Sequence, residues 1–313
     1  MTAVTPEPTS PGLERVIDAA EYRDRRLARA GRMVRSEKLA IAALLTSGFM
    51  ILIAIAAPVI APHDPAAQDI LQRLRPPAWS EGGDWSHVLG TDQLGRDVLS
   101  RLLYGARMSL FIAFASVLVA VSIGVVMGML SGYIGRWVDS VIMELADIFA
   151  SFPGILVAII VLSVFNPSIW LIIAVLGIEG WMIQARMVRG QVKALRETEF
   201  VEAARAVGAG PVRIMRKQLL PNIMAALLTL AVLELARLII AESILSFLGL
   251  GVQSPDSSWG LMIGEGRDYI TTAWWVVAFP GLAIVLTVLS LNLVSSWLRT
   301  ATDPFLRHGK GAS

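Results

Sequence analysis

The sequence predicts an all-α membrane protein with six transmembrane helices and both chain termini in the cytoplasm. Of its 313 residues, 55% are hydrophobic and only 17% are charged, whereas a soluble domain carries about 25% charged residues. The apolar residues also gather in runs long enough to cross a hydrocarbon core of about 30 Å as helices. Backbone amides in lipid must be hydrogen-bonded within their own segment, so such runs form helices.

Three uncharged runs and three apolar stretches with a few charges supply the six spans. The uncharged runs are Leu39–Ala61, Leu110–Ile134 and Ala273–Leu298, and the other stretches are Ile148–Phe165, Ser168–Ala185 and Asn222–Leu250. Pro153 and Pro280 fall inside spans, where proline is expected to kink a helix. The first run begins only at Leu39 and is longer than the apolar core of a signal peptide, so we expect a retained span rather than a cleaved leader.

Lysine and arginine set the predicted orientation, because they are enriched in cytoplasmic segments. The segment before Leu39 holds eight of them, residues 186–217 hold eight and the C-terminal tail holds three, which makes 19 of the 27 in the chain. Six spans place these three segments on one side, which is the cytoplasm. The predicted layout is therefore a cytoplasmic tail (1–38), a first transmembrane helix (39–62), an extracytoplasmic loop (63–109), a core transmembrane domain (110–298) and a cytoplasmic tail (299–313).

The N-terminal tail divides by composition into two parts. Residues 1–12 are rich in Thr, Pro, Glu, Ser and Gly, a composition typical of disorder. Residues 21–38 are strongly basic, and we expect a helix that approaches anionic lipid at the membrane surface.

Several classes of chemistry are excluded by the motifs that the sequence lacks. There are no cysteines, and no G-x-x-x-x-G-K-[ST] phosphate loop or G-x-S-x-G elbow occurs. The three histidines, His63, His87 and His308, are widely separated and form no H-E-x-x-H pattern, so we expect no metal site. We therefore expect a chain that is not an enzyme, binds no cofactor of its own and binds no nucleic acid.

Charged residues inside the fifth span are candidate functional residues, because each costs roughly 2.5–3.5 kcal/mol at a helix centre on an insertion scale. Glu234 and Arg237 are three residues apart and can pair on one helix face, whereas Glu242 points elsewhere. These residues either line a polar path or hold the helix bundle together. For Glu242 we favour packing. At the start of the third span, Asp147 is expected to pair with the neighbouring cytoplasmic segment.

One polar segment, residues 198–221, lies between two apolar stretches and is predicted to form two short helices. Thr198 can cap a helix from Glu199, Gly208 ends it, Gly210-Pro211 opens a second helix and Pro221 closes that helix at the membrane. The first helix carries a stripe of small and apolar residues at helical spacing, namely Phe200, Val201, Ala203, Ala204 and Val207. Such a helix either sits in the groove of a partner or lies on the protein's own base or on lipid.

The stretch "EAARAVGAGPVRIMRKQLLPN" (residues 202–222) resembles the EAA loop of ABC-importer membrane subunits. "LGTDQLGRDVLSRLLYGARMSL", "SFLGLGVQSPDSSWGLMIGEGR" and "ATDPFLR" resemble the C-type subunit of the dipeptide/oligopeptide/nickel permease branch. Gln218 stands where many relatives have histidine. The positions that match the EAA pattern are Glu202, Ala203, Ala204, Gly208, Ile214, Leu220 and Pro221.

The resemblance implies that the EAA residues couple the membrane helices to an ATPase subunit that docks on them. It also implies four partner chains: a homologous B-type membrane subunit, two ATP-binding subunits that hold ATP and Mg, and an extracytoplasmic substrate-binding protein. The expected location is the plasma membrane of a bacterium or archaeon. Peptide is the expected substrate, a nickel complex or other small solute is the alternative within the branch, and an ion-gradient-driven secondary transporter is the alternative outside it.

Overall fold

The computed structural model of the chain describes residues 38–302. The predictions for residues 1–12 and for the basic helix 21–38, except its last residue, lie outside the described residues, as does most of the motif "ATDPFLR". The chain divides after Ala42 into a short N-terminal unit and a large unit. Of the first unit only residues 38–42 are described, and they begin a helix, Lys38–Ile60.

The described part of the chain is helical, apart from connecting segments and an isolated bridge between Thr91 and Asp97. Short 3-10 turns cover Ile70–Gln72 and Arg267–Tyr269, and a five-residue π-helical segment covers Met215–Leu219. After the helix Lys38–Ile60, the α-helices are α2 (Val98–Ile134), α3 (Arg136–Ala150), α4 (Gly154–Val164), α5 (Ile169–Leu195), α6 (Glu199–Ala206), α7 (Pro211–Ile214), α8 (Leu220–Phe247), α9 (Trp259–Gly266) and α10 (Trp275–Thr302).

Five helices are long and apolar enough to cross a membrane, and a bent pair supplies the sixth predicted span. In that pair α3 and α4 meet at 76°. The apolar stretch Ile148–Phe165 is therefore not one straight helix. Pro153 occupies the N-cap of α4, where its missing N–H costs no hydrogen bond, so it separates two helices rather than kinking one. Pro280 does lie inside a helix, α10.

The helices extend beyond the apolar runs that predicted them. α2 begins at Val98, well before Leu110, because the Asp97 side chain accepts a hydrogen bond from the backbone N–H of Ser100 and caps it. The end of the predicted loop 63–109 is therefore helical. α5 continues past Ala185 to Leu195, so much of the predicted cytoplasmic segment is an extension of a membrane helix.

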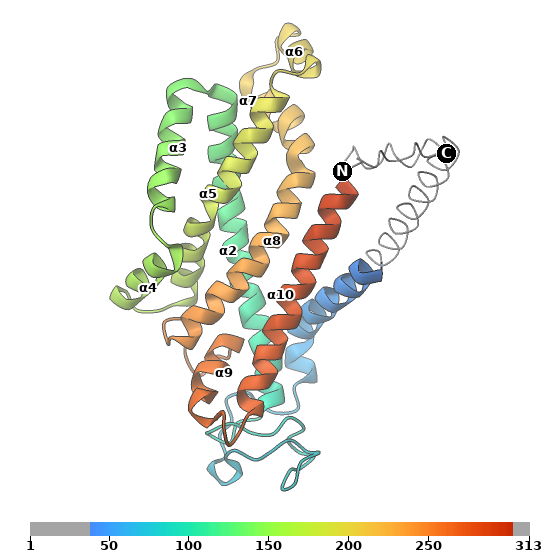
Figure 1. The fold of residues 1–313 in the computed structure, drawn as a ribbon, viewed down its shortest axis with the longest axis vertical. Helices are drawn as coiled ribbons and strands as arrows, with labels where there is room; N and C mark the ends of the chain where they lie inside the picture. Colours follow the sequence, from blue (N-terminus) through green and yellow to red (C-terminus); the bar gives the residue numbers. More distant parts are fainter. Residues whose placement is uncertain (1–37, 303–313) are drawn as a thin grey trace, which may run out of the picture. The chain divides into compact units, whose positions relative to one another are not determined.

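The large unit has two ends, which Figure 1 shows at the top and bottom of the ribbon. The α6 end contains α6 and the turn between α2 and α3. The loop end contains the segment from residue 61 to 97 together with α9. The described segments of the large unit that the charges place on one side of the membrane therefore lie at one end, and the longer loops predicted for the other side lie at the opposite end. The assignment of the α6 end to the cytoplasm stays a prediction.

Glycines on α2 bring it into close contact with α5. A Cβ atom at Gly124 would lie 2.4 Å from the Gln184 Cβ, and one at Gly128 would lie 2.6 Å from the Ala185 carbonyl oxygen. At Gly132 it would lie 2.8 Å from the Val192 Cβ. The spacing of four residues repeats along one helix face, and small residues of this kind let membrane helices approach closely. This glycine pattern was not predicted from the sequence.

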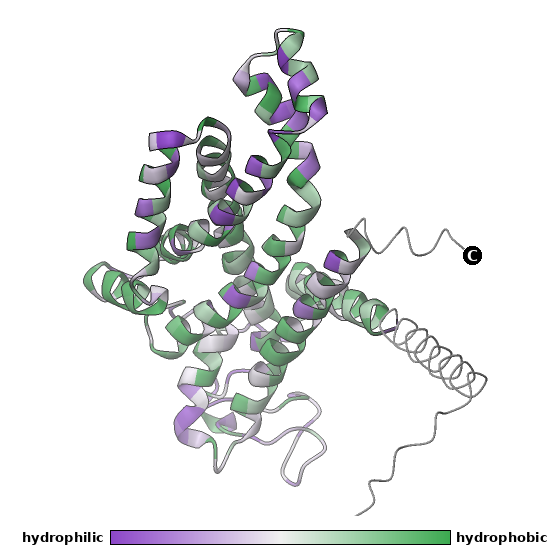
Figure 2. Ribbon diagram, turned by 45° about the horizontal axis from the view of Figure 1, so that its top comes forward, coloured by the Kyte–Doolittle hydropathy of each residue, from purple (hydrophilic) through white to green (hydrophobic). Residues whose placement is uncertain are grey.

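Apolar packing divides the large unit into a main core and smaller clusters. The main core joins residues of α2, α4, α5, α8 and α10, including Ile112, Leu162, Ile172 and Leu238. Figure 2 shows hydrophobic residues along most of each long helix and hydrophilic residues gathered around α6 and the chain that follows it. The apolar flanks of the long helices stay exposed, as expected for surfaces that face lipid or a second membrane subunit.

Candidate functional site

α6 is a short helix with a well-defined C-terminus. Gly208 has φ +82°, and its N–H donates to the Arg205 carbonyl while the Ala209 N–H donates to the Ala204 carbonyl. These two bonds form a Schellman motif, in which glycine avoids the steric cost of a positive φ. At the other end Thr198 occupies the N-cap, as predicted, but its hydroxyl donates to the Leu195 carbonyl, so its side chain does not cap α6.

The α6 helix buries one side and exposes the other. Val201 is fully buried in a cluster with Met129 of α2 and Val188 and Val192 of α5. Glu202 and Ala203 are exposed. Glu202 makes no ion pair with any residue in the range 38–302. The predicted stripe of small and apolar residues on α6 is therefore only partly packed against the protein, and much of it is exposed.

The second short helix does not end at Pro221. α7, the π-helical segment and α8 form one continuous helical run from Pro211 to Phe247. Pro221 directly follows the π-helical segment, so the wider turn lies where proline would otherwise interrupt a regular α-helical hydrogen-bond pattern. The prediction that Pro221 closes a separate helix is wrong, because the wider π turn carries the helix through this position. α7 is therefore continuous with the membrane-spanning helix α8.

The seven EAA positions fall into an outward and an inward group. Glu202, Ala203, Gly208 and Pro221 are exposed, and Ala204 and Leu220 are half-buried. Ile214 is fully buried in the same cluster as Val201. The segment therefore presents polar and small residues outward from two buried anchors, and we name residues 198–221 the coupling segment.

Ion pairs join α3 to the part of α5 that leads into the coupling segment, and a cation–π contact joins α6 to α2. Asp139 of α3 accepts hydrogen bonds from Arg189 Nη2 at 2.8 Å and Lys193 Nζ at 2.6 Å, both on α5. The Arg205 guanidinium of α6 lies 5.5 Å from the centre of the Tyr133 ring of α2. The expected pair of Asp147 is also present, with 2.6 Å to Arg186 Nη2.

A charge cluster lies within the membrane helices. Arg237 donates to Glu234, as the sequence predicted, with 2.6 Å between Nη2 and Oε1. It also donates to Glu179 of α5 through Nη1 at 2.9 Å and Nη2 at 2.6 Å. Glu234 is almost fully buried, whereas the Arg237 side chain is 38% exposed. Glu179 was not predicted to join this cluster. It is the one acidic residue in the apolar stretch Ser168–Ala185, and that position alone could have marked it as a candidate functional residue.

Glu242 does not belong to this charge cluster. Its carboxylate is fully buried and accepts hydrogen bonds from Ser109 Oγ of α2 at 3.0 Å and from Ser246 Oγ at 2.7 Å. Ser109 Oγ also accepts a hydrogen bond from the Trp259 N–H at the start of α9. Glu242 therefore joins α2, α8 and α9, which is the packing role favoured from the sequence.

Buried ions at the loop end join two of the segments that carried the family resemblance. Asp92 is fully buried and accepts hydrogen bonds from Arg96 Nε at 2.7 Å and from Arg101. Both arginines also donate to Glu265 of α9, at 2.7 Å and 2.8 Å. Two positive and two negative side chains thus compensate one another. This outer ion network fixes the loop before α2 against α9.

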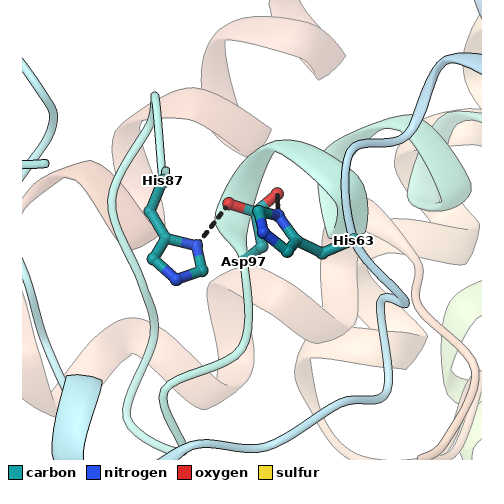
Figure 3. A group of neighbouring side chains, drawn as sticks. All are labelled: His63, His87 and Asp97. Atoms are coloured by element: carbon teal, nitrogen blue, oxygen red, sulfur yellow. Dashed lines mark hydrogen bonds and ion pairs between the residues drawn. The ribbon is translucent and has the colours of Figure 1, made fainter. Parts of the chain in front are cut away.

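The histidines are not all far apart in the fold. His63 and His87 have ring centroids 4.7 Å apart, and both rings lie beside Asp97 at the start of α2 (Figure 3). Their separation in the sequence therefore does not keep these two rings apart in the fold, because the chain folds back at the loop end. His308 lies outside the described residues.

Two protein-family models match the chain. Residues 124–308 match the family described as binding-protein-dependent transport system inner membrane component. Residues 26–77 match the N-terminal TM domain of oligopeptide transport permease C. Together the two matches cover the coupling segment, the charge cluster and the first predicted span.

Curated relatives match over most of their length. The chain is 40% identical over 271 residues to the di/tripeptide transport system permease protein DppC of Pseudomonas aeruginosa, covering 87% of this chain and 89% of the relative. It is 41% identical over 273 residues to the dipeptide transport system permease protein DppC of Escherichia coli, covering 87% and 91%. Such coverage leaves no large domain of these relatives unmatched.

A solved structure shares the fold. The structure titled as inward-facing conformations of the MetNI methionine ABC transporter aligns with a TM-score of 0.52 at 24% identity, covering 65% of this chain and 97% of the matched chain. The likeness shows a shared helical fold over 65% of this chain. The chain belongs to the binding-protein-dependent transport system inner membrane component family, as a multi-pass plasma-membrane permease subunit of an ABC importer.

Proposed function

We propose that this permease imports di- and tripeptides. The proposal rests on relatives of about 40% identity whose names specify di- and tripeptide or dipeptide transport. These relatives align over the loop end as well as the core, and the loop end is where a substrate-binding protein would deliver a solute in the proposed orientation. The α6 end, with its basic residues, then faces the cytoplasm.

The coupling segment is the proposed docking site for an ATP-binding subunit. The observation that carries this assignment is the contrast between exposed Glu202 and Ala203 and buried Val201 and Ile214. The exposed side is free to enter a groove, while the buried side is anchored to α2 and α5. A push on α6 is therefore transmitted to α5 directly and to α8 through α7.

The transporter is proposed to contain a homologous membrane subunit, two ATP-binding subunits and an extracytoplasmic binding protein. ATP and Mg bind to the ATP-binding subunits, since this chain lacks a phosphate loop. The charge cluster is proposed to line the path between the two membrane subunits. Two carboxylates, Glu179 and Glu234, face the single guanidinium of Arg237, so the cluster favours the ammonium group of a peptide, which Glu179 can bind.

Transport by the complete complex in vesicles tests the substrate and the energy source together. We expect uptake of a labelled dipeptide that requires ATP and the binding protein and persists when ionophores collapse ion gradients. Uptake that stops with the ionophores but needs no ATP would overturn the proposal in favour of an ion-driven transporter. ATP-dependent uptake of nickel complexes with no uptake of peptides would overturn the proposed substrate.

A further inference from the structure

A cluster of metal-binding side chains lies at the loop end, away from the coupling segment and the charge cluster. His63 follows the first helix, His87 lies in the loop, and Asp97 caps α2 (Figure 3). His87 Nδ1 is 3.0 Å from Asp97 Oδ1, and His63 Nδ1 is 3.8 Å from Asp97 Oδ2. One ligand atom from each of the three residues lies within 4.8 Å of the others. Three segments of the chain thus supply one ligand each.

The spacing suits a transition-metal ion. Zinc bonds nitrogen and oxygen ligands at about 2.0–2.1 Å in a tetrahedral arrangement, which places neighbouring ligand atoms roughly 3.3 Å apart. The 3.0 Å between His87 Nδ1 and Asp97 Oδ1 is close to this value, whereas His63 Nδ1 lies 3.8 Å from the other carboxylate oxygen, Oδ2. One ligand atom of each residue already lies within 4.8 Å of the others, so rotation of the His63 ring toward Oδ1 is the adjustment that a single ion would require.

The carboxylate is held in place before any ion binds. Asp97 Oδ2 accepts hydrogen bonds from the Ser100 N–H and from Ser100 Oγ, both at 2.7 Å. Ser100 Oγ in turn accepts a hydrogen bond from the backbone N–H of His63 at 3.0 Å. These contacts orient Asp97 and bring His63 to it, as second-shell hydrogen bonds do around known metal sites.

Access to the cluster comes from the His63 side. The Asp97 side chain is 1% exposed and that of His87 is 14% exposed, whereas that of His63 is 38% exposed. An ion can therefore reach the cluster from solvent and keep water in its fourth position. The negative charge of Asp97 also offsets the positive end of the α2 dipole, which would otherwise repel a cation.

We propose that His63, His87 and Asp97 form a binding site for a divalent transition metal, with zinc as the representative ion. The two imidazoles bind as neutral ligands through Nδ1, and Asp97 binds as a carboxylate through Oδ1. The hydrogen bond between His87 and Asp97 is then replaced by two bonds to the metal. A bound ion joins the end of the first helix, the loop and α2, so it stiffens the face that a binding protein would meet.

Metal titration of the full-length chain in detergent, purified without a histidine tag, tests this site. We expect the metal-free chain to bind one Zn²⁺ and to give the visible absorption of a tetrahedral site with Co²⁺. His63→Asn and His87→Asn should each weaken binding by roughly tenfold or more, by comparison with the 10- to 100-fold effect of outer-shell changes. His308→Asn removes the third histidine of the chain and is the matched control, which should bind as the parent does.

Thermal unfolding separates a metal site from a hydrogen-bonded cluster. Zn²⁺ should raise the unfolding temperature of the parent and of His308→Asn, but not that of His63→Asn. His63 is exposed enough that its replacement should leave the fold intact. Failure of the parent to bind Zn²⁺ or Co²⁺, or undiminished binding by both His63→Asn and His87→Asn, would overturn the proposal. Both readouts are independent of transport.

Discussion

Arg237 of α8 and Glu179 of α5 form an ion pair between two membrane helices, with 2.6 Å between Nη2 and Oε2. Glu234 supplies a second carboxylate to the same guanidinium. The pair connects α5, which packs against the coupling segment, to α8, which continues from the end of that segment. Relative movement of α5 and α8 must therefore stretch or break this contact.

Replacing Arg237 tests how much its positive charge stabilises the two carboxylates of the charge cluster. Arg237→Gln leaves Glu234 nearly fully buried without its cation, so we expect a loss of about 2 kcal/mol in unfolding free energy. This value is below that for a fully buried pair because Arg237 is 38% exposed. The measurement is thermal or denaturant unfolding in detergent. The double variant Glu234→Gln/Arg237→Gln should recover much of the loss, and equal instability of both variants would contradict this explanation.

Charge reversal at Glu202 tests the docking role of α6. Glu202 is exposed and unpaired within residues 38–302, so Glu202→Lys should leave unfolding of the chain unchanged. We expect binding of the ATP-binding subunit and ATP-driven uptake to fall at least severalfold. Glu81→Lys, an exposed charge reversal at the loop end, is the matched control for subunit binding. Unchanged assembly and uptake in Glu202→Lys would remove Glu202 from the coupling segment's contact surface.

The Schellman turn at Gly208 gives a graded test of the same segment. A Cβ at Gly208 meets nothing within 4 Å, so a substitution there is limited by its φ of +82° rather than by space. Gly208→Val should cost about 1–2 kcal/mol locally and lower substrate-stimulated ATP hydrolysis. Gly208→Asn should retain more activity, because asparagine tolerates this conformation better. If both variants lose activity equally, the space outside Gly208 matters more than its conformation.

The close approach of α2 and α5 predicts a strong effect at Gly128. A Cβ there would lie 2.6 Å from the Ala185 carbonyl oxygen, which is backbone and cannot rotate away. Gly128→Val should therefore destabilise the chain by about 1–3 kcal/mol, measured by thermal unfolding. Gly190→Ala on α5 is the control, since a Cβ there has nothing within 4 Å. Equal effects of the two substitutions would show that helix propensity, not packing, governs Gly128.

Asp92 is expected to be the residue on which the outer ion network depends most. It is fully buried and neutralises Arg96 and Arg101, so Asp92→Asn should cost about 3–5 kcal/mol of unfolding free energy. The loop before α2 should also become more accessible to protease. Asp268→Asn, whose side chain is 77% exposed, should change neither property. Normal protease resistance in Asp92→Asn would show that the loop is held by other contacts.

Much of the fold could be predicted because membrane helices are set by local composition. Runs without charge located the spans, and Gly208 marked the end of α6 correctly. The predicted helix ends were less accurate where a helix extends beyond its apolar run or is broken inside it. α2 begins at Val98 because Asp97 caps it, and Pro153 breaks the third span at the start of α4. A hydropathy pattern detects neither effect.

The order of the amino acids was enough to predict the apolar spans, the polar coupling segment and the pairing of Glu234 with Arg237. Each of these depends on residues near one another in the chain. Three contacts became visible only in the folded chain: Glu179 pairs with Arg237, His63 and His87 meet at Asp97, and Ile214 is buried in the same cluster as Val201 of α6. These contacts join residues from separate segments, so they exist only after glycine-mediated packing of α2 on α5 and folding of the loop end have brought those segments together.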